Sequence, residues 1–89
     1  MNRKHYGVIT FPTSQAAAAA EAQVKAAGYE CRLIPMPEQI SAGCGLVLQV
    51  SVEQTLDIQK QLRDRQISLE GSYEVWFENR KKFVQKMEG

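Results

Sequence analysis

Apolar positions along the chain fall into four short runs that have the spacing of β-strands. Residues 6–11 (YGVITF) and 45–50 (GLVLQV) are largely apolar at consecutive positions, which is typical of strands buried on both faces. Residues 30–37 (ECRLIPMP) contain two prolines, and because proline cannot donate to a neighbouring strand this run is predicted at a sheet edge. Residues 67–77 alternate strictly between apolar or small and polar positions, which predicts a half-buried fourth strand.

The segment between the first two strands has the composition and boundaries of a helix. Residues 15–27 (QAAAAAEAQVKAA) are rich in alanine, which has the highest helix propensity and allows close approach to a sheet. Thr13 or Ser14 is placed to cap its start, and Gly28 stands where a left-handed C-terminal cap belongs.

A second helix is predicted between the third and fourth strands, over residues 51–65. Ser51 and Gln54 have the spacing of a capping box, and Leu56 and Leu62 are expected to face inward.

The predicted order of elements is therefore βαββαβ. This order indicates an α+β protein with a ferredoxin-like sandwich: one antiparallel sheet, two helices on one face, strands one and three central, and strands two and four at the edges. Residues 1–78 are assigned to this domain, and residues 79–89 to a basic C-terminal tail that is expected to be helical.

Length and charge narrow the classes of function. The chain has 89 residues, enough for one domain, and its net charge of +1 gives no sign of a general nucleic-acid surface. It has no run of about 20 apolar residues that would span a membrane. Two cysteines do not make a disulfide framework of the kind that small secreted domains need, so a reducing cytoplasm is the expected location.

Most site chemistries are missing from the sequence. Two cysteines and His5 lack the spacing of a zinc site, so neither a metal nor a cofactor is predicted. The third strand has no aromatic residue on which RNA bases would stack, and no phosphate-binding loop or catalytic triad is recognisable. The remaining candidates for chemistry are the two thiols.

Cys31 and Cys44 are expected to differ in role. In a hairpin of the second and third strands they would lie roughly 13 Å apart, too far for a disulfide. Cys31 alternates with Leu33 and is interpreted as a small core residue. Cys44 lies between Gly43 and Gly45, which permit unusual backbone angles and leave the sulfur open to a partner molecule. A turn cysteine without a function is the alternative reading of the same residues.

Three motifs together resemble a known family. VITFPT ends the first strand, CRLIPMP forms the second, and ISAGCGLVL, with Ser41, Cys44 and Gly45 in a Ser-x-x-Cys-Gly element, leads into the third. From about Tyr6 to Tyr73 the chain resembles the selenium/sulfur carrier-like family. The resemblance implies that Cys44 carries sulfur or selenium as a persulfide or selenosulfide, with a desulfurase-like donor protein and an acceptor protein as partners.

An alternative function is a non-catalytic interaction or regulatory module. Trp76 is predicted on the polar side of its strand, on an open sheet face where an exposed tryptophan favours a partner. Phe83, Val84 and Met87 would form an apolar stripe on the tail that covers this face, in the same chain or in a homodimer.

Overall fold

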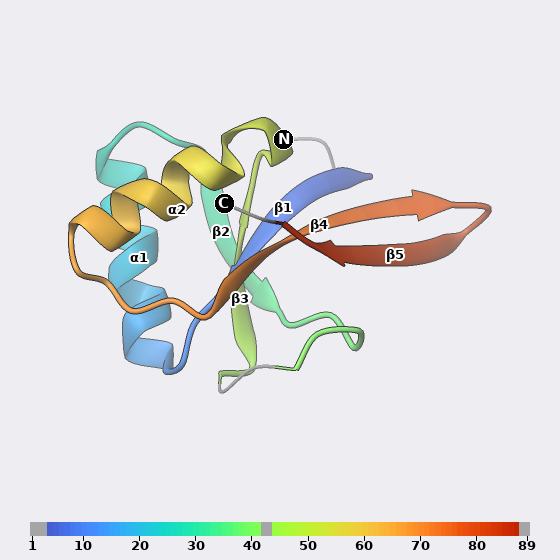
Figure 1. The fold of residues 1–89 in the computed structure, drawn as a ribbon, viewed down its shortest axis with the longest axis horizontal. Coiled ribbons are helices and arrows are strands. Elements are labelled where there is room, and N and C mark those ends of the chain that lie inside the picture. Colours follow the sequence, from blue (N-terminus) through green and yellow to red (C-terminus); the bar gives the residue numbers. More distant parts are fainter. Residues whose placement is uncertain (1–3, 42–43, 88–89) are drawn as a thin grey trace.

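A computed structural model describes residues 4–41 and 44–87 of the chain (Figure 1). In chain order the elements are β1 (His5–Thr10), α1 (Ser14–Ala26), β2 (Cys31–Pro35), β3 (Leu46–Val50), the short 3₁₀ helix η1 (Val52–Gln54), α2 (Thr55–Asp64), β4 (Gly71–Glu78) and β5 (Lys81–Lys86).

The strands form one antiparallel sheet in the order β2-β3-β1-β4-β5. A mixed architecture with an antiparallel sheet and two helices is confirmed, and β2 lies at an edge as its prolines indicate. The four-stranded ferredoxin-like arrangement is not confirmed, because a fifth strand lies beyond β4, which is therefore not an edge.

The prediction of a helical tail is wrong. Asn79 and Arg80 have φ angles of 50° and 67°, and a two-residue turn of this kind matches the twist of a β-hairpin. It folds the chain back so that Lys81–Lys86 pairs with β4 at six positions, from Glu78↔Lys81 to Tyr73↔Lys86. The basic segment therefore belongs to the same sheet as the preceding strands.

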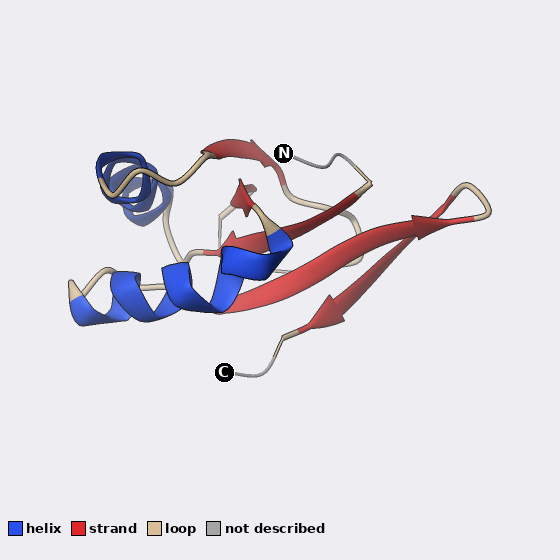
Figure 2. Cartoon of the chain, turned by 90° about the horizontal axis from the view of Figure 1, so that it is seen from above, coloured by secondary structure: helices blue, strands red, loops and turns tan. Residues whose placement is uncertain are grey.

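Both helices lie on one side of the sheet, and the β4–β5 hairpin extends away from them (Figures 1 and 2). Among the described residues, no helix is long and apolar enough to cross a membrane.

The boundaries of α1 follow from its sequence. The hydroxyl of Thr13 accepts a hydrogen bond of 3.1 Å from the backbone N–H of Ala16, which caps the first turn as expected. Ala17, Ala20 and Val24 form its buried stripe. Gly28 follows the helix with a φ of 92°, a conformation that glycine adopts without steric cost.

The start of α2 differs from the prediction. Residues 52–54 form a 3₁₀ turn, and the Ser51 hydroxyl donates to the Glu53 carboxylate at 2.6 Å, so no capping box forms. This extra turn shifts the inward face of α2 to Thr55, Ile58, Gln59 and Leu62. Leu56, expected to be buried, is 38% exposed, whereas Leu62 is buried as expected.

The sheet carries a hydrophobic cluster on each face. The helix-side cluster joins strand residues such as Ile9, Phe11 and Leu48 to the apolar faces of α1 and α2. The far-side cluster comprises Tyr6, Val8, Ile40, Val47 and Val75. β1 and β3 contribute to both clusters, which explains why their sequences are apolar at consecutive positions.

Close packing between β1 and α2 depends on Gly7. A Cβ atom at Gly7 would lie 1.9 Å from Oγ1 of Thr55, the first residue of α2, which is itself fully buried. A Cβ atom at Gly45 would meet nothing within 4 Å. The first glycine is therefore required by tertiary packing, and the second is not.

We expect Gly7→Ala to lower the free energy of unfolding by about 1–3 kcal/mol, because α2 must move away from the sheet. Gly45→Ala is the matched control and should change stability by less than about 0.5 kcal/mol. Urea unfolding of both variants measures the difference, and equal effects would contradict the packing argument.

Cys31 also belongs to the helix-side cluster, which confirms its reading as a core residue. Its thiol contacts the backbone carbonyl of Glu21 with a sulfur–oxygen distance of 3.9 Å. Burial raises the pKa of the Cys31 thiol above its ordinary value of 9.0; Lys25 opposes this change and Glu21 adds to it.

A raised pKa in the folded state makes stability depend on pH in the alkaline range. As pH rises above 9.0, the unfolded chain releases the Cys31 proton first, so the free energy of unfolding should fall. In Cys31→Ala this contribution is absent, and the fall between pH 9 and pH 10 should be smaller than in the unmodified chain. Above pH 10.0 the free energy of unfolding should fall further in both proteins, because burial raises the pKa of Tyr6. Urea unfolding at several pH values checks this, and identical profiles would contradict it.

Candidate functional site

The chain between β2 and β3, residues 36–45, forms the connection that contains Cys44. The last pair of the β2–β3 ladder is Pro35↔Leu46, and just beyond it the N–H of Met36 donates to the carbonyl of Gly45 at 3.0 Å. These contacts bring the two ends of the connection together. In Figure 1 it lies at the same end of the molecule as the start of α1.

The Cys44 side chain is buried rather than uncovered. It is 7% exposed and belongs to the helix-side cluster, and its sulfur accepts a hydrogen bond of 3.4 Å from the N–H of Leu46. Side chains alternate along a strand, and Leu48 of β3 faces the helices, so the same parity turns Cys44 toward them. The expectation that the sulfur stands open at the hairpin tip is wrong for this conformation.

The residues expected to support the turn differ in position. Ser41 is exposed, and Gly43 lies outside the described residues. Gly45 does not have a positive φ angle, so it supplies no unusual backbone conformation here. The space around its Cα is open, since an added Cβ atom would meet nothing within 4 Å.

The connection is attached to the far face of the sheet through residues that the sequence analysis did not single out. Ile40 is 5% exposed and lies in the far-side cluster, while its N–H donates to the carbonyl of Pro37 at 3.0 Å. The side-chain amide of Gln39 donates to the backbone carbonyl of Lys82 in β5 at 3.4 Å. The available sequence signal was an isolated isoleucine within a polar loop.

Cys44 and Ile40 therefore lie in clusters on opposite faces of the sheet. The connection passes around the end of β2 and β3, with Ile40 packed on the far side and Cys44 on the helix side. Movement of Cys44 into solvent would require rearrangement of this connection.

Trp76 lies on the helix-bearing side of the sheet, not on the opposite face as expected. Ser72, four residues earlier in β4, donates from its hydroxyl to Gln59 of α2, and residues at this spacing share a face. The Trp76 ring stacks on Phe83 of β5, with centroids 5.7 Å apart and an interplanar angle of 16°.

The apolar stripe expected on the tail does not form. Adjacent residues of a strand point to opposite faces, so Phe83 stacks on Trp76 while Val84 packs against the far-side cluster. Met87 is half-buried, and its N–H donates to the carbonyl of Ser72 at 2.8 Å.

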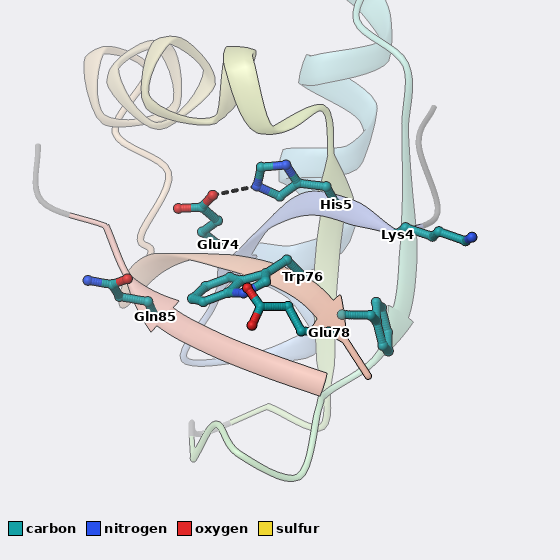
Figure 3. A pocket seen from close by; sticks show the side chains of 7 residues that line it. Lys4, His5, Glu74, Trp76, Glu78 and Gln85 are labelled. Atoms are coloured by element: carbon teal, nitrogen blue, oxygen red, sulfur yellow. Dashed lines mark hydrogen bonds and ion pairs between the residues drawn. The ribbon is translucent and has the colours of Figure 1, made fainter. Parts of the chain in front are cut away.

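A hollow of about 440 Å³ lies beside Trp76 (Figure 3). His5 of β1 and Glu74 of β4 line it and are hydrogen-bonded through His5 Nε2, and Lys4, Glu78 and Gln85 also line it. The charges in this hollow have mixed sign, and it lies at the opposite end of β1 from the connection that holds Cys44.

Comparison with family models matches residues 6–74 to the family described as "Putative Se/S carrier protein-like". The matched span covers most of the chain and includes Cys44 with the whole β2–β3 connection. No curated protein and no solved structure matches the chain. On the basis of the family match, this chain belongs to the Se/S carrier protein-like family.

Proposed function

We propose that this chain carries a sulfur or selenium atom on Cys44, as a persulfide or selenosulfide, and passes it to a partner protein. The observation that carries the proposal is the family match, which spans Ser41, Cys44 and Gly45 and whose description names a chalcogen carrier. Cys31, the other thiol, is held in the core beneath α1, and burial raises its pKa, so little of it is present as thiolate at neutral pH.

The proposed reaction is thiol–persulfide exchange. The Cys44 thiolate attacks the outer sulfur of a donor persulfide, a new S–S bond forms at Cys44, and the S–S bond of the donor breaks. The donor leaves as a thiolate and takes up the proton that Cys44 released. Sulfane sulfur moves without net oxidation, and a thiol on the acceptor removes it by the same exchange. The chemistry needs no metal and no acid–base pair.

Two protein partners are implied by this chemistry. The donor is a desulfurase-like enzyme that presents a persulfide, and the acceptor presents a nucleophilic thiol. Both exchanges require free thiols, and Cys31 and Cys44 are both free in the structure. A reducing cytoplasm would maintain them in that state.

Burial of Cys44 sets a condition on the reaction. Because Cys44 is only 7% exposed, its thiol cannot meet a second protein, so exchange proceeds from a state in which the connection has moved. The observed rate is then the rate of the exposed state multiplied by its population. Within the connection, Ile40 is buried in the far-side cluster and Met36 packs against it, so burial of Ile40 should contribute to setting this population.

Incubation with a cysteine desulfurase and cysteine should add the mass of one sulfur atom to the intact protein. Peptide mass spectrometry should locate the addition on Cys44, and Cys44→Ser should abolish it. Cys31→Ser is the matched control and should keep the adduct. An adduct that survives in Cys44→Ser and disappears in Cys31→Ser would contradict the assignment of the carrier residue.

Ile40→Ala should raise the reactivity of Cys44 toward a thiol reagent. Truncation of a fully packed isoleucine to alanine destabilises the packed state by about 2–5 kcal/mol. Each 1.4 kcal/mol by which the free energy of opening falls raises the exposed population about tenfold. We expect an increase of at least about tenfold in the rate of Cys44 modification, measured at pH 7.5 under native conditions.

Val75→Ala controls for general destabilisation. Val75 lies in the same far-side cluster as Ile40, but on β4 rather than on the connection. It should leave Cys44 reactivity within about twofold of the unmodified chain. Equal acceleration by both variants, accompanied by equal acceleration of Cys31, would indicate global unfolding and refute local opening.

A further inference from the structure

The free edge of β5 offers backbone groups for pairing with another strand. Residues 79 and 80 form a two-residue turn, so Glu78↔Lys81 is a hydrogen-bonded pair, and alternate pairs along the ladder follow it. The bond from the N–H of Met87 to the carbonyl of Ser72 continues this alternation. The backbone groups of Lys82, Val84 and Lys86 therefore point away from β4, toward the outer edge.

One of these outward groups already has a partner. The carbonyl of Lys82 accepts the side-chain amide of Gln39 at 3.4 Å, a long and exposed hydrogen bond. This contact shows that a carbonyl of the edge accepts a donor from outside the strand. The described residues place no strand beside Val84 and Lys86.

The edge carries positive charge. Residues 78–87 contain Arg80, Lys81, Lys82 and Lys86, with Glu78 as the one carboxylate. Lys81 lies across from Glu78, so residues of opposite charge face each other at that position of the ladder. Lys82 and Lys86 are exposed and bracket Val84 on the far face of the sheet, where Glu38 of the β2–β3 connection lines the same hollow as Lys82. Two lysines beside one carboxylate leave that face of the edge with a positive charge.

Charge argues against a second copy of the same strand as occupant. An antiparallel pair of β5 strands centred on Val84 would place Lys82 opposite Lys86 of the other copy, twice. Like charges directly opposite each other destabilise a strand pair, and lysine at an edge is a common means of preventing self-association. Carboxylate side chains at these positions would instead pair with both lysines.

The outer edge of the β4–β5 hairpin is accessible to a partner strand. It projects beyond the helices, and Figures 1 and 2 show β5 along its outer margin. Phe83 is 38% exposed on one face and Phe77 of β4 is 39% exposed on the other, so apolar surface flanks the edge on both sides. The side-chain ammonium of Lys82 lies 5.6 Å from the centre of the Phe77 ring.

We propose that β5 binds an extended acidic segment of a partner protein by strand addition, antiparallel or parallel to Lys81–Lys86. Main-chain hydrogen bonds from Lys82, Val84 and Lys86 supply the pairing, and carboxylates of the partner opposite Lys82 and Lys86 select an acidic sequence. The incoming strand takes over the carbonyl that Gln39 contacts. This surface is separate from Cys44, and the proposal does not rest on the carrier reaction.

A synthetic peptide with alternating glutamate and valine tests the proposal on the full chain. Trp76 is the one tryptophan and stacks on Phe83 of β5, so its fluorescence should change on binding. Amide hydrogen exchange followed by NMR should show new protection at Val84 and Lys86. The amides of Phe83 and Gln85, which face β4, should already be protected without peptide.

Lys82→Glu combined with Lys86→Glu should weaken peptide binding at least about tenfold, because two attractive contacts become repulsive. Lys60→Glu is the matched control on the exposed face of α2 and should have no effect. Val84→Pro removes one outward N–H without changing charge, and it should also weaken binding. A peptide with lysine in place of glutamate should not bind.

Other results would overturn the proposal. Failure of the acidic peptide to bind at millimolar concentration would overturn it. Binding that gives no new amide protection at Val84 and Lys86, or that the double reversal leaves unchanged, would overturn it as well. Equal or tighter binding of a single-stranded oligonucleotide would identify a nucleic-acid surface instead. A dimer in sedimentation that the single reversal Lys82→Glu strengthens, without peptide binding, would identify a second copy as the occupant, because residue 82 would then lie opposite a lysine of the other copy.

Discussion

Burial of β1 and β3 on both faces is the constraint on which the rest of the structure depends. Val8, Ile9, Val47 and Leu48 are all fully buried, and they point alternately to the two faces. Each face therefore needs a cover. The two helices cover one face, and no helix is present among the described residues to cover the other.

The far face is covered in part by the β2–β3 connection, and Val84 of β5 extends the apolar surface beside it. Ile40 from the connection and Val84 from β5 pack on the same far-side cluster, and Gln39 joins the two segments through the carbonyl of Lys82. The connection that covers this face also contains Cys44. The connection contributes to stability while it holds the thiol inside.

That double role gives burial of Cys44 a physical explanation. The strand parity that continues from Leu48 turns the thiol toward the helices, and Ile40 holds the preceding chain on the other side. In a carrier, a protected sulfur has a chemical advantage, because a persulfide exposed to solvent thiols is lost by exchange. Controlled opening of the connection would limit transfer to an engaged partner.

Local composition was sufficient for several features of the chain. The strands around Val8 and Leu48, the cap at Thr13, the left-handed glycine at Gly28 and the edge position of β2 were all predictable from the sequence. Each depends on the residue itself or on near neighbours: apolar runs, a hydroxyl before a helix, a residue without Cβ, and prolines that cannot donate.

The candidate site was predictable only in part. Cys44 could be singled out from its glycine neighbours, but its burial, the anchor at Ile40 and the face of Trp76 could not. Each of these depends on which distant segment packs against it, and a single sequence does not contain that pairing.

The fifth strand was missed because its lysines and short apolar pair also fit an exposed helix, and only the turn at Asn79 pairs it with β4. The sequence by itself determined the first four strands and the two helices, because those choices depend on local backbone preferences. The tertiary structure decided which residues are covered, because cover comes from parts of the chain that are far apart in sequence.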